Sequence, residues 1–132
     1  MRVSYMDKIR ELIHQAEYKV TYADELSGIM KIENEQDGIK NLIIGVVPPL
    51  LIMEYYLFSF KEDSIEMFKA LLQKNRDMLH GAFVINEDGD KVLYRYTMQI
   101  ENMDFNELEA ALNSLGLLLY EYREQMIYFS KR

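Results

Sequence analysis

Residues 81–101 are the most constrained part of the chain, because a turn signal and a side-chain alternation agree there. Asp88-Gly89 lies between two runs of β-forming residues and suits a two-residue type I′ turn. Counting outward from that turn, the expected pairs are Glu87–Asp90, Ile85–Val92, Phe83–Tyr94 and Gly81–Tyr96. Apart from Leu93, the second run alternates between apolar and polar residues. We therefore expect an antiparallel hairpin with one face on the core.

The segment Leu50–Phe60 is apolar at both odd and even positions, apart from Glu54 and Ser59. A strand of this kind is covered on both faces. We expect the domain's own helix to cover one face and a partner protein to cover the other. The candidate contact residues form an odd set, Leu51, Met53, Tyr55 and Leu57, and an even set, Ile52, Tyr56 and Phe58. The pattern leaves open which set meets the helix.

Helical periodicity marks residues 3–18, a segment opened by Asp63, and residues 105–129. Each begins with a capping residue followed three positions later by an acidic residue: Ser4 with Asp7, Asp63 with Glu66, and Asp104 with Glu107. We expect the inner face of the second helix, which packs on the core, to consist of Ile65, Phe68, Leu72 and Leu79. Asn75 falls on this same face. Because a buried amide must find partners, we expect Asn75 to bind the backbone of the strand that follows, rather than a ligand.

Two further strands are expected at residues 28–33 and 41–47, separated by a polar turn at Asp37-Gly38. Pro48-Pro49 cannot donate ladder hydrogen bonds and ends the second of them. The order is helix, three strands, helix, two strands, helix. Since the connections between paired strands are short, the pairs are antiparallel. We expect one α+β domain over residues 1–132, with helices packed on an antiparallel five-stranded sheet.

Composition excludes several classes of function. The chain has 15 Lys and Arg against 22 Asp and Glu, a net charge of −7, which argues against binding a nucleic-acid backbone. The absence of cysteine excludes disulfides, thiol catalysis and cysteine-based metal sites. The longest uncharged run, residues 41–53, contains two prolines and is too short to span a membrane. The first twenty residues lack an uninterrupted apolar stretch, so we expect a cytoplasmic protein.

Residues that carry chemistry are scarce. His14 and His80 form no metal-ligand pattern, and nothing in their spacing brings them together. The acidic groups at residues 33–37 and 87–90 do not fit the calcium loop and are expected to be solvated turns. All glycines are isolated, which gives no support for nucleotide binding. We expect no enzyme activity, no metal and no cofactor.

A set of residues carries a resemblance to a known family. It comprises Leu71-Leu72, Asn75, Leu79, Gly81-Ala82-Phe83, Asp88-Gly89, Val92 and Tyr94-Arg95-Tyr96, followed by leucines at heptad steps. This stretch, from Phe68 to Tyr122, resembles the YbjN family of candidate bacterial sensory-transduction regulators, which has the fold of type III secretion chaperones. Residues 9–20 resemble the family's opening helix and following strand. Residues 24–60 match only in their strand pattern.

The resemblance implies a non-enzymatic module, commonly a homodimer, that binds another polypeptide. In the secretion chaperones a partner chain wraps around the dimer in extended form. The very apolar strand at residues 50–60 departs from the family, which favours a general adaptor or regulator over a dedicated secretion chaperone. The alternative is a small-molecule sensor with a pocket between the sheet and the long C-terminal helix, motivated by the Tyr and Met content of that interface. Nucleic-acid binding is the least favoured hypothesis.

Overall fold

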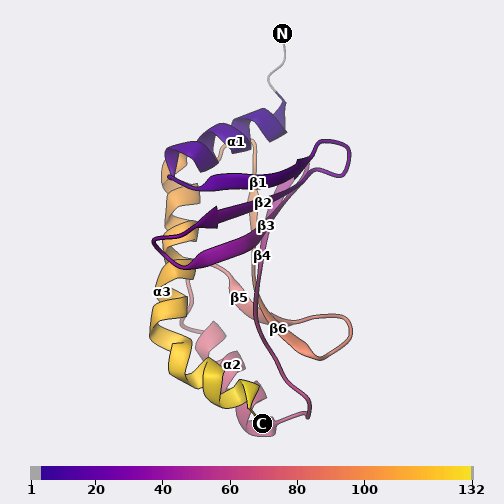
Figure 1. The fold of residues 1–132 in the computed structure, drawn as a ribbon, viewed down its shortest axis with the longest axis vertical. Helices are drawn as coiled ribbons and strands as arrows, with labels where there is room; N and C mark the ends of the chain where they lie inside the picture. The colour runs from indigo at the N-terminus through magenta and orange to yellow at the C-terminus, as the bar shows by residue number, and fades with distance from the viewer. Residues whose placement is uncertain (1–3, 132) are drawn as a thin grey trace.

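The computed structural model describes residues 4–131, so the expected role of Val3 in the first helix lies outside the described residues. Six antiparallel strands form one sheet in the order β1-β2-β3-β4-β6-β5. The strands are β1 (Lys19–Asp24), β2 (Ile29–Asn34), β3 (Ile39–Val47), β4 (Leu50–Ser59), β5 (Ala82–Ile85) and β6 (Lys91–Gln99). The helices are α1 (Tyr5–Gln15), α2 (Ile65–Asn75) and α3 (Phe105–Ser130). Helix α3 runs along the sheet, with α1 at the β1 end and α2 at the β5 end (Figure 1).

The expected α+β class and element order are confirmed, but the five-strand count is wrong because it omits β1. That strand forms one edge of the sheet and, among the described residues, pairs only with β2. Its side chains are exposed or half-buried, and its register shifts between Val20 and Tyr22. A bulged edge strand of this kind lacks the two-residue apolar period by which strands are recognised in sequence.

Two of the three expected helix caps are confirmed. The Ser4 hydroxyl accepts a hydrogen bond from the Asp7 N–H at 3.1 Å, and the Asp104 carboxylate accepts one from the Glu107 N–H at 2.9 Å. At α2 the expected cap, Asp63, is wrong by one residue. Ser64 is the N-cap there, and its hydroxyl accepts from the Met67 N–H at 3.2 Å. Each cap satisfies a backbone donor that the first helical turn leaves unpaired.

The inner face expected for α2 is also wrong. Ile65, Leu72 and Leu79 are 74%, 69% and 90% exposed, whereas Met67 and Leu71 are buried and Phe68 is half-buried. Helix α2 carries two apolar stripes and lies at the end of the sheet beside β5, so only one stripe is covered. Leu79 lies beyond the end of the helix. The second stripe is therefore left on the surface.

The hairpin of β5 and β6 has the predicted register, with Phe83 opposite Tyr94 and Ile85 opposite Val92. The expected type I′ turn is wrong. The Gly89 N–H donates to the Asn86 carbonyl at 3.0 Å, and Gly89 has a φ of +72° but Asp88 is not left-handed. A type I′ turn needs both central residues left-handed.

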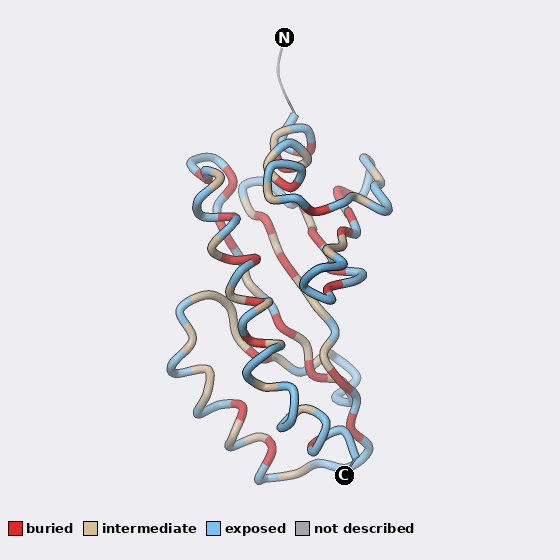
Figure 2. The backbone as a smooth tube through the Cα atoms, turned by 60° about the vertical axis from the view of Figure 1, so that its left-hand side comes forward, coloured by how far each residue is buried: buried red, intermediate tan, exposed pale blue. Residues whose placement is uncertain are grey.

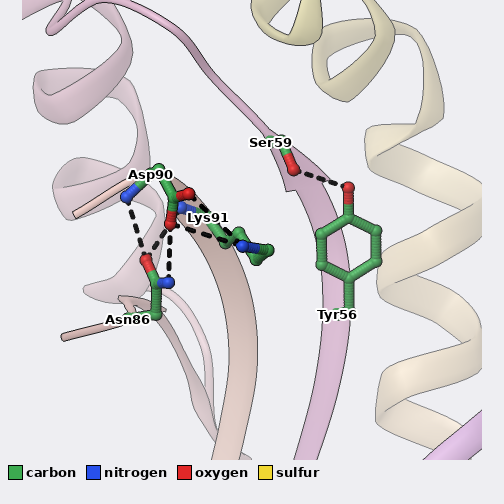
Figure 3. A network of polar contacts seen from close by, with 5 residues as sticks. All are labelled: Tyr56, Ser59, Asn86, Asp90 and Lys91. Atoms are coloured by element: carbon green, nitrogen blue, oxygen red, sulfur yellow. Dashed lines mark hydrogen bonds and ion pairs between the residues drawn. The ribbon is translucent and has the colours of Figure 1, made fainter. Parts of the chain in front are cut away.

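The Asn86 side chain explains this longer loop (Figure 3). Its Oδ1 accepts from the Asp90 and Lys91 N–H groups at 3.0 and 2.8 Å, and its Nδ2 donates to the Asp90 carboxylate at 2.7 Å. The last bond holds the pKa of Asp90 below its usual value. The Asn86–Lys91 pair closes the loop. The two strands therefore keep the predicted register, although the turn between them is not the two-residue type that was expected.

The core follows β2, β3, β4 and β6 and the first half of α3. The buried residues of α3 are Leu108, Ala111, Leu112, Leu115, Leu118 and, at its far end, Phe129. Between Leu118 and Phe129, the apolar residues Leu119, Tyr122 and Met126 are half-buried, and exposed positions dominate this part of the helix (Figure 2). The helix is thus anchored over its first half and less completely covered along its second.

Two glycines give a matched test of this packing. A Cβ at Gly116 would lie 3.8 Å from the Asp37 carboxylate, an ordinary contact, whereas one at Gly81, with φ +84°, would lie 2.5 Å from the Tyr94 ring. We expect Gly116→Ala to stabilise the protein by about 0.5–1 kcal/mol, because alanine favours the helix. We expect Gly81→Ala to destabilise it by more than about 1 kcal/mol. Urea unfolding of both variants measures the changes, and equal signs would contradict this account.

Candidate protein-interaction surface

An apolar surface lies where α2 meets the edge strand β5. We define the α2–β5 face by its exposed residues Ile65, Leu72, Leu79 and Ile85. A hollow of about 330 Å³ opens at Leu72 and Ile85, and all but one of its lining residues are apolar. They are Phe68, Leu71 and Leu72 of α2, Phe83, Val84 and Ile85 of β5, and Asn75. Exposed apolar residues grouped around an apolar hollow are typical of an interface with another protein.

Asn75 sets the geometry of the α2–β5 face. Its Oδ1 accepts a hydrogen bond from the Phe83 N–H at 2.7 Å, and its Nδ2 donates to the Phe83 carbonyl at 3.1 Å. The two bonds satisfy backbone groups on the outer edge of β5, where the strand has no ladder partner among residues 4–131. They tie the last residue of α2 to the second residue of β5.

A second contact fixes the base of the hairpin. The fully buried Tyr94 donates its hydroxyl to the His80 carbonyl at 2.8 Å, and burial raises its pKa, with a smaller contribution from Tyr96. Gly81 is needed here because a side chain would meet the Tyr94 ring. The His80 ring packs edge-on against Tyr96, with Nδ1 3.2 Å from the Tyr96 hydroxyl oxygen.

The residues of β4 that were expected to meet a partner have different environments. Leu51 and Met53, from the odd set, are fully buried, and Phe58, from the even set, is 5% exposed. A register shift between Tyr56 and Phe58 explains why Phe58 faces the core. The others remain reachable: Ile52, Tyr55 and Leu57 are half-buried, and Tyr56 is 53% exposed. Strand β4 is flanked by β3 and β6, so a partner would reach these residues over the sheet surface or from the end of β4.

A crevice of about 490 Å³ separates the end of β4 from the second half of α3. Its walls are Tyr55, Tyr56 and Leu57 on β4, Leu119, Tyr120, Arg123 and Met126 on α3, and the turn at Asp37-Gly38. Tyr18 lies close to two of these residues. Its hydroxyl is buried and lacks a hydrogen-bond partner within the described chain. Burial raises its pKa, with further contributions from Asp37 and Tyr55.

The two histidines lie far apart in the structure. His14 lies on α1 and His80 follows α2, and these helices stand at opposite ends of the molecule (Figure 1). Within residues 4–131 no group of three His, Asp or Glu side chains is placed to hold a metal ion. Among the same residues no helix is both long enough and apolar enough to cross a membrane.

Sequence reasoning missed the α2–β5 face, although a signal for it was present. Ile65, Leu72 and Leu79 were recognised as one apolar set but were expected to point inward. The neighbouring pair Met67 and Leu71 forms a second set one position away, and it is this pair that the structure buries. Two apolar stripes on a short helix indicate that one of them is available for an external contact.

Comparisons with known proteins agree with this fold. The family model CesT_Tir_1 matches residues 2–132. No curated protein matches the chain. YbjN from E. coli, a candidate transcription regulator, has a TM-score of 0.68 and 9% identity, covering 94% of this chain and 96% of that one.

A chain of the HopA1–SchA chaperone–effector complex has a TM-score of 0.63 and 12% identity, covering 99% of this chain and 100% of that one. At these identities the two structures show a shared fold. They confirm the expected resemblance to YbjN and to the type III secretion chaperones.

Asn75 provides a test of how the α2–β5 face is held. We expect Asn75→Ala to lower the free energy of unfolding by about 2 kcal/mol, because two backbone groups of Phe83 lose their partners. Asn113, exposed on α3, is the matched control, and we expect Asn113→Ala to change stability by less than about 0.5 kcal/mol. Urea unfolding measures both. Similar losses in the two variants would show that the Asn75 bonds contribute nothing specific.

Proposed function

The chain belongs to the CesT_Tir_1 family, and we propose that it is a non-enzymatic, chaperone-like adaptor that binds another polypeptide and acts as a homodimer. The fold shared with SchA, the chaperone of a chaperone–effector complex, supports binding of a protein partner. The observation that carries the proposal is the α2–β5 face, where three large apolar side chains are 74%, 69% and 90% exposed.

The α2–β5 face suits a two-fold interface between copies of this chain. In such an interface the same patch on both copies meets itself, so projecting groups and hollows must lie side by side. Here the exposed Leu72 stands at the hollow that Phe83, Val84 and Ile85 also line. Burying exposed apolar area of this kind is the main favourable term in stable association.

The reachable residues of β4 offer a second position for a partner. Tyr56 and the half-buried Ile52 retain the role expected from sequence, as a surface for a bound polypeptide. We assign the dimer to the α2–β5 face, because its side chains are more exposed and lie together. We assign the partner polypeptide to the β4 side of the molecule.

Light scattering after size exclusion tests the dimer. We expect the wild-type protein to be a dimer at micromolar concentration and Leu72→Glu to be a folded monomer, because burying a charge in an apolar interface is costly. Leu26→Glu, in the β1–β2 turn, is the matched control: Leu26 is fully exposed and lies outside the α2–β5 face. A monomeric wild type would remove the homodimer from the proposal. Monomers from Tyr56→Glu, with Leu72→Glu still dimeric, would move the interface to β4.

Recovery from source-cell lysate tests partner binding. We expect the tagged chain to retain one dominant polypeptide at near-equal amount, identified by mass spectrometry. We expect Tyr56→Glu to lose this partner while remaining dimeric, and Leu26→Glu to keep it. Recovery of the chain with only its own copies would contradict an adaptor function and favour a dimer that senses a small molecule.

A further inference from the structure

The crevice of about 490 Å³ between the end of β4 and the second half of α3 contains two side chains of opposite charge. Asp37 comes from the turn between β2 and β3, and Arg123 comes from α3. Neither forms an ion pair within residues 4–131. Most of the other lining residues are apolar or aromatic, and they include Tyr55, Tyr56 and Tyr120. A hollow of this size, with few polar groups in apolar walls, is typical of small-molecule sites.

Helix α3 sets the spacing of the two charges. The Asp37 carboxylate lies against α3 at Gly116, where a Cβ would be 3.8 Å from its oxygen. Arg123 follows two turns later on the same side of the helix. Seven residues at 1.5 Å each separate the two positions by about 10 Å along the helix axis. The fold therefore presents the two charges to the crevice separately, and a ligand that carries both opposite charges would match them.

Gly116 leaves space beside the Asp37 carboxylate. It lies inside a 26-residue helix, where glycine costs about 0.5–1 kcal/mol relative to alanine. Packing does not require a glycine there, because an added Cβ would meet only the Asp37 carboxyl group, at an ordinary contact distance. The glycine therefore lowers the stability of α3 and provides open space next to a charged group.

A buried hydroxyl lies close to the same carboxylate. Tyr18 is 6% exposed, and its hydroxyl lacks a hydrogen-bond partner within the described chain. Burial raises the pKa of Tyr18, and the nearby Asp37 and Tyr55 raise it further. A buried hydroxyl without a partner costs about 1–3 kcal/mol. An ammonium group has three donors, so one placed beside Asp37 could serve the carboxylate and a neighbouring hydroxyl oxygen together.

We propose that this crevice binds a small molecule in which an apolar body joins an ammonium group to a carboxylate. The ammonium group pairs with Asp37 in the space that Gly116 leaves, and the carboxylate pairs with Arg123. The apolar body packs against the rings of Tyr55 and Tyr56. Charged groups recognised in this way fix the orientation of a ligand, while the apolar walls supply contact area.

The site would also regulate the proposed adaptor. Tyr56 belongs both to the crevice and to the surface that we assign to the partner polypeptide. A bound small molecule and the partner would therefore compete, and each would weaken the binding of the other by the same factor. This consequence rests on the proposed function, whereas the small-molecule site itself does not.

An NMR titration of the full-length protein tests the site. The probe is 8-aminooctanoate, whose charges stand at the two ends of an extended hydrocarbon chain. Octanoate and octylamine are the matched controls, since each lacks one of the charges. We expect 8-aminooctanoate to bind at least about fivefold more tightly than either control, because each control leaves one protein charge unpaired. We expect the amide signals of Gly38, Gly116 and Arg123 to shift.

Gly116→Ala separates ligand binding from stability. We expect this variant to be more stable than the wild type, yet to bind 8-aminooctanoate at least about fivefold more weakly, because its methyl group fills the space beside Asp37. Asn113→Ala, one turn earlier and exposed on α3, is the matched control and is expected to bind normally. Loss of the ligand in a stabilised protein cannot be attributed to unfolding.

Arg123→Glu tests the charge at the other end. We expect this variant to prefer 1,8-diaminooctane to 8-aminooctanoate, the reverse of the wild-type preference. Lys69→Glu, the same charge change on α2, is expected to keep the wild-type preference. Both positions are exposed, so both variants are expected to fold.

Several results would overturn the site. Equal affinity for the three probes would show that the two charges take no part in binding. Signal shifts confined to the α2–β5 face would place the ligand elsewhere. Unchanged binding by Gly116→Ala would remove the ammonium group from the side of Asp37, and no binding at millimolar concentration would exclude this class of ligand. None of these results bears on the adaptor, which is tested by recovery of its partner from lysate.

Discussion

The long antiparallel ladder between β4 and β6 is the element on which the rest of the structure depends. It extends from the pair Leu50–Gln99 to the pair Ser59–Lys91 and joins two smaller units. At one end β4 pairs with β3 and so carries β1 and β2; at the other, β6 pairs with β5. The buried residues of both units belong to one hydrophobic cluster, to which the shared strands contribute Leu51, Met53, Phe58, Val92, Tyr94 and Met98. The ladder makes one sheet from both.

The parts of this fold that could be predicted from sequence are those set by local chemistry. The hairpin register was predicted from the alternation of apolar and polar side chains. It is correct although the predicted turn type is wrong, because burial of Tyr94 and Val92 fixes which face of β6 points inward. The caps at Ser4 and Asp104 followed from the spacing of a short polar residue and a carboxylate. The prediction that Asn75 binds the backbone of the following strand is confirmed, because a buried amide next to a strand has few other hydrogen-bond partners.

What could not be predicted depends on tertiary position. Strand β1 has no buried face of its own and is ordered by pairing with β2, so its sequence carries little periodic signal. The stripe of α2 that faces inward depends on how the helix docks beside β5, and Met67 with Leu71 competes with Ile65 and Leu72 on nearly equal terms. The division of the β4 residues between core and surface depends on a bulge near Leu57, which no local pattern marks. The expectation that β4 meets a partner came from its two-sided apolarity, and only part of that apolar surface remains reachable.

The two surfaces assigned here differ in the physics that would fill them. The α2–β5 face is apolar, and its backbone edge at Phe83 is already satisfied by Asn75, so it offers hydrophobic area without a need for strand pairing. The end of β4 is different, because Tyr56 is 53% exposed there beside the half-buried Tyr55 and Leu57. Hydrophobic area selects by shape and favours a fixed partner such as an identical copy. A molecule that pairs with itself through α2 and β5 would keep the end of β4 free for a different chain. Because the two surfaces share no lining residue, occupation of one leaves the other open.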